Sequence, residues 1–143
     1  MTAQVAIPLK PPAGGIEIAP LRLFVSRTLP AMIKVSVLYP HNPAGFRFDH
    51  GYYRTTHVPM VVARLRAGAP HAAACRSFSI DKGIGGGGTP GAPAPFVAIA
   101  HFHAESVEAF MAAFGPHAQE IIADVPNYTN ITPIMQISEV VTG

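Results

Sequence analysis

The sequence has little charge, a single cysteine and no tryptophan. Asp, Glu, Lys and Arg together make up 13% of the 143 residues, against 49% hydrophobic residues. The net charge of +2 is too weak to indicate a nucleic-acid partner, and the arginines are scattered along the chain. One cysteine, Cys75, excludes an internal disulfide and is typical of a reducing compartment such as the cytoplasm. No apolar run approaches the length of a membrane span, so we expect no membrane partner.

Hydrophobic side chains are abundant instead. A chain of this length can bury a core as one domain without a disulfide or a metal. A small domain has much surface to cover, and few charged residues are available here to cover it. A large apolar surface shared with a second copy of the chain resolves this conflict, so we expect a homodimer.

The N-terminal segment differs from the rest of the sequence. In "IPLKPPAGGIEIAP" (7–20), proline or glycine interrupts every short apolar run, which argues against a packed element. Met32 stands directly before the first regular pattern. We therefore expect residues 1–31 to form a disordered or extended arm and residues 32–143 to form the folded domain.

From residue 32 onward, the hydrophobic pattern changes between the periods of strands and helices. It predicts four strands and two helices, the second helix followed by a further helical turn through Ile122. The strands cover residues 33–39, 74–81, 96–103 and 131–141, and the helices cover residues 49–67 and 105–114. The order β-α-β-β-α-β predicts an α+β, ferredoxin-like fold, in which both helices lie on one face of an antiparallel sheet. Neither face of strand 96–103 is polar throughout, so we expect the sheet of another copy to cover the open face.

Polar groups are concentrated in the stretch "FDHGYYRTTHVP" (48–59). At helical spacing His50, Tyr53, Arg54 and His57 fall at i, i+3, i+4 and i+7, which places them on one stripe. Pro59 has no N–H and biases Val58 away from the helical conformation, so we expect two helical pieces to meet at His57.

This stripe allows a functional and a structural interpretation. In the functional one, His57 is a general acid or base, because its ordinary pKa lies near neutrality. Tyr53 or Tyr52 donates a hydrogen bond to a substrate oxygen, and Asp49 fixes the histidine tautomer. In the structural one, Asp49 is a helix N-cap, the tyrosine hydroxyls are paired and His57 caps a carbonyl. The further candidates for substrate contact are Tyr52, His50, Arg54 and Tyr128.

Two other patterns carry weaker functional signals. In "HFH", His101 and His103 lie on the same strand face at a spacing that suits two metal ligands, and a third would have to come from His57, His71 or Glu105. We favour the interpretation that these histidines lie where the strand runs out of the core into solvent, and we therefore expect no metal site. The glycine-rich stretch "KGIGGGGTPGAPAP" (82–95) lacks the lysine of a phosphate-binding loop and precedes a strand, so it indicates a hairpin loop, which would suit a flap over the mouth of a cavity.

Three stretches make the chain resemble the EthD family, which is named for a protein linked to ethyl tert-butyl ether degradation. They are "MIKVSVLYP", "FDHGYYRTTHVPMV" and "PNYTNITPIMQISEVV", which together span roughly residues 32–141. The most specific motif is D-x-x-Y-Y-x-x-x-H-x-P, which runs from Asp49 to Pro59. The resemblance implies a dimeric α+β barrel, in which the sheets of two ferredoxin-like units face each other.

The resemblance also limits the function. Relatives with this barrel include cofactor-free monooxygenases, muconolactone isomerases and haem-dependent enzymes, and some fungal look-alikes are linked to dehydration or decarboxylation of polyketides. The oxidoreductase label of the family is an analogy with its degradation pathway. We expect a cofactor-free enzyme that acts on a small apolar organic molecule, by oxidoreductase-like or proton-transfer chemistry. The alternatives are a non-catalytic protein that holds a ligand for an oxygenase, and a haem- or metal-binding protein.

Overall fold

The computed structural model describes residues 32–68 and 73–142. The predicted N-terminal arm and His71 lie outside these residues. The strands are β1 (Ile33–Pro40), β2 (Ser77–Lys82), β3 (Phe96–Ala104) and β4 (Ile134–Glu139). The helices are α1 (His50–Tyr52), α2 (Val58–Leu65), α3 (Val107–Phe114) and α4 (Ala118–Asp124), with a π-helical turn at Tyr53–His57 and 3-10 turns at Gly115–His117 and Val125–Asn127.

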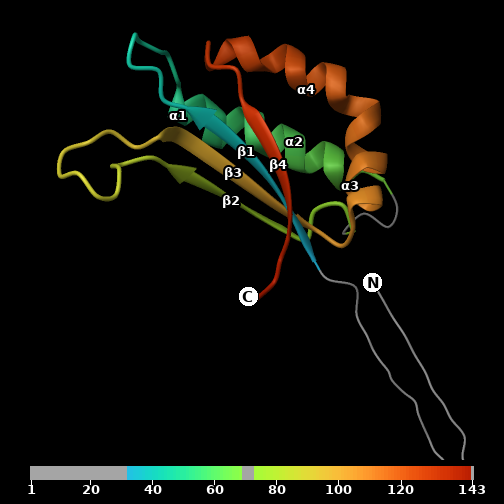
Figure 1. The fold of residues 1–143 in the computed structure, drawn as a ribbon. Helices are drawn as coiled ribbons and strands as arrows, with labels where there is room; N and C mark the ends of the chain where they lie inside the picture. Colours follow the sequence, from blue (N-terminus) through green and yellow to red (C-terminus); the bar gives the residue numbers. More distant parts are fainter. Residues whose placement is uncertain (1–31, 69–72, 143) are drawn as a thin grey trace, which may run out of the picture. The chain divides into compact units, whose positions relative to one another are not determined.

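The four strands form one antiparallel sheet in the order β2-β3-β1-β4. The helices lie on one face of this sheet (Figure 1). The predicted α+β class and the four-stranded antiparallel sheet are therefore confirmed. Two strands are shorter than predicted. β2 begins only at Ser77, and β4 begins after Pro133, which has no N–H to donate to a sheet ladder.

The helix that carries the tyrosines and His57 is continuous through its proline. A proline ring inside a regular α-helix clashes with the carbonyl four residues back, here that of Thr55. The chain avoids this with a wider turn, because the N–H of Val58 donates to the carbonyl of Tyr53, five residues back. The predicted departure of Val58 from the helical conformation is wrong, since Val58 has φ −64° and ψ −41°.

The core lies between the helices and the face of the sheet that they cover. Alternate residues of β1 and β3 point into it, among them Val35, Tyr39 and Phe102. Burial of each large apolar side chain stabilises the fold by roughly 1.5–3 kcal/mol. The helices contribute Val58, Val61, Val62, Leu65, Phe110 and Ile121.

The opposite face of the sheet is not covered by any element of the described residues. Strand register places side chains on it in three rows, two of them polar and one mostly apolar. This face is more polar than strand 96–103 alone indicated, because β2 and β4 contribute serines and a glutamine. The rows are Ser77–His103–Lys34–Ser138, Ser79–His101–Ser36–Gln136 and Asp81–Ile99–Leu38–Ile134.

No helix within residues 32–68 and 73–142 combines the length and the apolar character needed to cross a bilayer.

Candidate functional site

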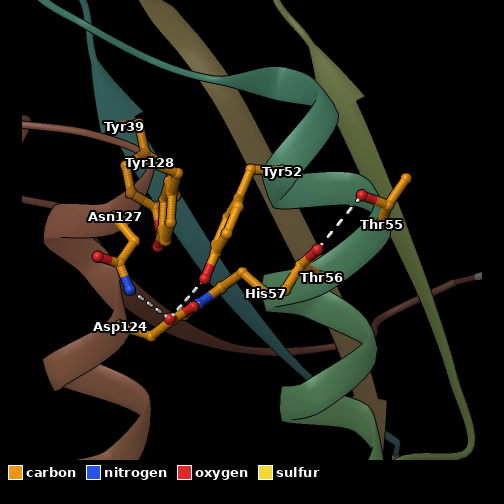
Figure 2. A network of polar contacts seen from close by, with 8 residues as sticks. All are labelled: Tyr39, Tyr52, Thr55, Thr56, His57, Asp124, Asn127 and Tyr128. Atoms are coloured by element: carbon orange, nitrogen blue, oxygen red, sulfur yellow. Dashed lines mark hydrogen bonds and ion pairs between the residues drawn. The ribbon is translucent and has the colours of Figure 1, made fainter.

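The site is centred on His57, the last residue of the π-helical turn. The residue is 4% exposed, and its Nδ1 lies 2.8 Å from Oδ2 of Asp124, at the end of α4. Figure 2 shows the two side chains meeting between the two helical segments. An ionised carboxylate can only accept hydrogen bonds, so the proton of a neutral imidazole must lie on Nδ1. The dyad therefore fixes the tautomer of His57.

Asp124 is itself held by two further donors. Its Oδ1 accepts hydrogen bonds from the Tyr52 hydroxyl at 2.8 Å and from Nδ2 of Asn127 at 2.9 Å (Figure 2). Burial opposes ionisation of this carboxyl, but the hydrogen bonds from His57, Asn127 and Tyr52 outweigh it and lower the pKa of Asp124. The carboxylate is thus kept charged and in place beside the imidazole.

His57 is poised as a base. Burial lowers the pKa of His57, against the opposing effect of the Asp124 hydrogen bond and charge, so the imidazole is neutral at neutral pH. Its Nδ1 is committed to Asp124, and within the described residues Nε2 has no hydrogen-bond partner. Nε2 therefore carries an available lone pair.

His57 lines a small cavity between the sheet and the helices. The cavity has a volume of about 100 Å³. Its polar side chains are those of His57, Tyr53 and Tyr39, and among the residues that the structure describes no charged side chain lines it. The apolar part of its wall includes Val37, Val61, Phe102, Phe110, Ile121 and Met135.

Tyrosine rings pack around the imidazole. Tyr53 stacks on His57 with the ring centroids 5.6 Å apart and an interplanar angle of 14°, and Tyr128 approaches it at 4.5 Å. The hydroxyls of Tyr39 and Tyr128 lie 2.6 Å apart. Burial and the neighbouring Tyr39 hydroxyl raise the pKa of both Tyr53 and Tyr128 far above the ordinary tyrosine value. These hydroxyls therefore stay protonated.

The other residues predicted for the site lie elsewhere. Asp49 caps the helix, because its Oδ1 accepts a hydrogen bond from the Tyr52 N–H at 3.0 Å. The role expected for Asp49, fixing the tautomer, is taken by Asp124. Arg54 is exposed and does not share the buried face of Tyr53 and His57. His50 packs on the Phe48 ring with the centroids 4.6 Å apart, outside the cavity wall.

Sequence reasoning missed Asp124 and Tyr39. Asp124 lies 67 residues from His57, so no local spacing connects them. Its one signal is the Asp-x-x-Asn spacing to Asn127 at the end of a helix, next to the "PNY" of the family-like stretch. Tyr39 appears in the sequence only as the last inward position of an alternating strand.

The two strand histidines lie on the opposite face of the sheet. Nδ1 of His101 lies 2.9 Å from the Ser36 hydroxyl, and its Nε2 lies 3.1 Å from Oδ2 of Asp81. In the part of the chain that the structure describes, no three His, Cys, Asp or Glu side chains come together as a metal site would require. The glycine-rich loop between β2 and β3 extends beyond the end of the sheet (Figure 1), and none of its residues lines the His57 cavity.

Comparisons with known proteins agree with this fold. A family model described as the EthD domain matches residues 44–132. An EthD-like protein of Ralstonia eutropha JMP134, known from a crystal structure, is 48% identical with a TM-score of 0.70, over 78% of this chain and 94% of that one. No curated protein sequence matches the chain at a significant level.

A more distant structure shares the fold alone. It is an ethyl tert-butyl ether degradation (EthD) family protein of Bacillus halodurans C-125, 18% identical with a TM-score of 0.51, over 76% of this chain and 97% of that one. The family model covers more than half of the sequence, including the whole helix with His57 and the residue Asp124. The chain therefore belongs to the EthD family.

Proposed function

We propose that the protein is a small cytoplasmic enzyme that moves a proton on an apolar, uncharged organic molecule bound in the His57 cavity, without a cofactor. One observation carries this proposal. The buried imidazole of His57 has one nitrogen fixed by a carboxylate, its other nitrogen has no hydrogen-bond partner among the described residues, and the residue lines an apolar cavity. A purely structural histidine would satisfy both nitrogens or expose one to bulk water.

The electrostatics of the dyad suit a general base. Because the imidazole is neutral, Nε2 can accept a proton from a bound molecule. The imidazolium that forms would be stabilised by the Asp124 carboxylate at 2.8 Å. Asp124 and Tyr52 act through His57 and are positioning residues in this proposal.

The absence of charge in the cavity wall limits the substrate. An ionic substrate would lose its hydration without gaining an opposite charge, at a cost of several kcal/mol or more. The volume of about 100 Å³ suits a compact molecule. An apolar wall alone would be enough to hold an apolar ligand. The imidazole with a fixed tautomer in this cavity therefore supports proton transfer better than ligand storage.

A turnover screen tests this function. Small uncharged organic compounds are incubated with wild-type protein, the His57→Gln variant and the control His117→Gln, whose histidine lies on the surface beside Glu120. We expect at least one compound to be converted by the wild type and the control but not by His57→Gln. Compounds that bind equally to all three proteins, with no conversion by any, would instead support the non-catalytic, ligand-holding role.

We also propose that a second copy of the chain covers the open face of the sheet, as in a dimeric α+β barrel. The apolar row of this face supports this arrangement, because Ile134 is 52% exposed in the single chain. In each copy, Leu38 and Ile134 would bury apolar surface against the partner.

A charge placed in the apolar row should separate the dimer. Leu38→Arg would bury an unpaired guanidinium against the partner sheet, so we expect a shift from dimer to monomer in sedimentation velocity. Ile84→Arg, in the exposed glycine-rich loop, is the control and should leave the mass unchanged. A wild-type protein that sediments as a monomer at all concentrations would contradict the dimer.

A further inference from the structure

Three buried tyrosine side chains lie beside the cavity. Their three O–H donors outnumber the hydrogen bonds that the three hydroxyls can form with one another. Tyr39, Tyr53 and Tyr128 are at most 2% exposed, and each hydroxyl has one proton to donate. Among the described residues, the one hydrogen bond within this group joins Tyr39 to Tyr128 at 2.6 Å. Even a second bond between Tyr53 and Tyr39 would leave one O–H without an acceptor. Since buried donors are nearly always satisfied, the spare proton indicates a missing acceptor.

The lining of the cavity indicates where that acceptor would lie. Tyr39 and Tyr53 are among the lining residues together with His57, whereas Tyr128 is not. Either hydroxyl of the Tyr39–Tyr128 pair can be the donor. When Tyr128 donates, the proton of Tyr39 is free for an acceptor in the cavity, and a hydroxyl that accepts a hydrogen bond donates its own proton more strongly.

We propose that the cavity binds a small uncharged carbonyl compound, whose oxygen accepts hydrogen bonds from the Tyr39 and Tyr53 hydroxyls while His57 removes a proton from the adjacent carbon. This inference rests on the proposed function and names its substrate class. It makes Tyr39 a catalytic residue that the sequence did not indicate.

The proposed step conserves atoms and electrons. The C–H bond next to the carbonyl breaks, and its proton passes to Nε2 of His57. The electron pair left on carbon forms a C=C bond, and the carbonyl π electrons move onto the oxygen. The resulting enolate oxygen is stabilised by the two phenol O–H donors, and the imidazolium by Asp124. The proton then returns to the same carbon or to a conjugated one, so no oxidant or reductant is consumed.

The volume of the cavity sets the size of a suitable probe. An apolar protein cavity of about 150 Å³ takes up benzene, which has six heavy atoms. The cavity of about 100 Å³ should therefore hold four or five, as in acetone. Isobutene has the same shape with a methylene group in place of the carbonyl oxygen, so it is a matched control ligand.

Binding of [2-¹³C]acetone measures the carbonyl contact independently of catalysis. Hydrogen bonds to a carbonyl oxygen move its ¹³C resonance downfield. We expect a downfield shift on binding to wild-type protein and to His57→Gln, and a smaller shift with Tyr39→Phe and Tyr53→Phe. Tyr52→Phe is the matched control and should keep the wild-type shift, since the Tyr52 hydroxyl bonds Asp124 rather than lining the cavity.

Deuterium exchange of acetone in D₂O then measures the proton transfer. We expect wild-type protein to accelerate the exchange, and a loss of about 10²-fold or more in the protein-catalysed rate with His57→Gln or Tyr39→Phe. If His57→Gln matches the wild type while the carbonyl shift persists, the proton-transfer function fails and the carbonyl site remains. The inference is overturned if the shift is equal in wild type and both cavity tyrosine variants. It is equally overturned if isobutene binds and acetone does not.

Discussion

Replacing Asp124 with asparagine is expected to reduce turnover at the His57 site by about 10⁴-fold, the loss seen when the carboxylate behind the catalytic histidine is neutralised in a Ser-His-Asp triad. The physical reason is twofold. The amide can donate to Nδ1 and so stabilise the wrong tautomer, and it carries no charge to stabilise the imidazolium. The hydroxyl of Tyr52 and the amide of Asn127 would remain nearby, so the local packing should change little.

The pH dependence of kcat/KM distinguishes this effect from misfolding. Since the neutral imidazole is the base, the wild-type rate should rise with pH through the pKa of His57. The Asp124 charge and hydrogen bond raise that pKa against the effect of burial, so their loss should move the inflection to lower pH. An NMR titration of the His57 ring measures the same shift directly.

Glu120→Gln is the control for the Asp124 variant. Glu120 lies in the same helix, but it is exposed and pairs with Arg64. We expect the wild-type rate and inflection with this control. An unchanged inflection in Asp124→Asn would contradict the role of the carboxylate, whatever happens to the rate.

Phe110→Ala is expected to have the largest effect on stability. Phe110 is 2% exposed, stacks on Phe114 with ring centroids 5.6 Å apart and forms part of the cavity wall. Its truncation should lower the free energy of unfolding by about 3–5 kcal/mol. That is a large share of the roughly 5–15 kcal/mol typical of a domain. The space left by the phenyl ring would join the existing cavity. Neighbouring side chains could not easily fill this enlarged space, so the loss of stability should be large.

Urea unfolding followed by circular dichroism measures the loss. Met111→Ala, one residue further along the same helix but 46% exposed, is the control and should cost about 1 kcal/mol or less. Similar losses in the two variants would show that α3 does not pack on the sheet as the structure has it. A Phe110→Ala protein that folds should also bind ligands larger than the wild type accepts.

The fold was largely predictable because its signals are local. Alternation in residues 33–39 predicted β1, and the register confirms that Val35 and Tyr39 share one face. Errors arose where backbone and tertiary context compete. The π-helical turn before Pro59 lets the helix continue through the proline. Residue spacing alone does not distinguish this continuous helix from an interrupted one. The ends of β2 and β4 depend on which residues find partners in the sheet.

Most of the residues of the candidate site that could be predicted from the sequence lie in the stretch 48–59. Tyr52, Tyr53 and His57 stand out because they lie within one short polar stretch. Asp49 is the nearest carboxylate to His57 in the sequence, but a helix start needs a cap for its free N–H groups, and Asp49 supplies it. Arg54 was placed with His57 by spacing alone, and the structure turns it to solvent.

The sequence by itself determined the order of strands and helices and the short polar stretch that carries His57. Those follow from side-chain periodicity and local composition, which act within a few residues. Only the tertiary structure decided that α4 brings Asp124 to His57, and that Tyr39 and His57 line the same cavity. Each of these depends on the packing of elements far apart in the chain, since a distance of 2.8 Å between residues 57 and 124 is set by the whole core between them.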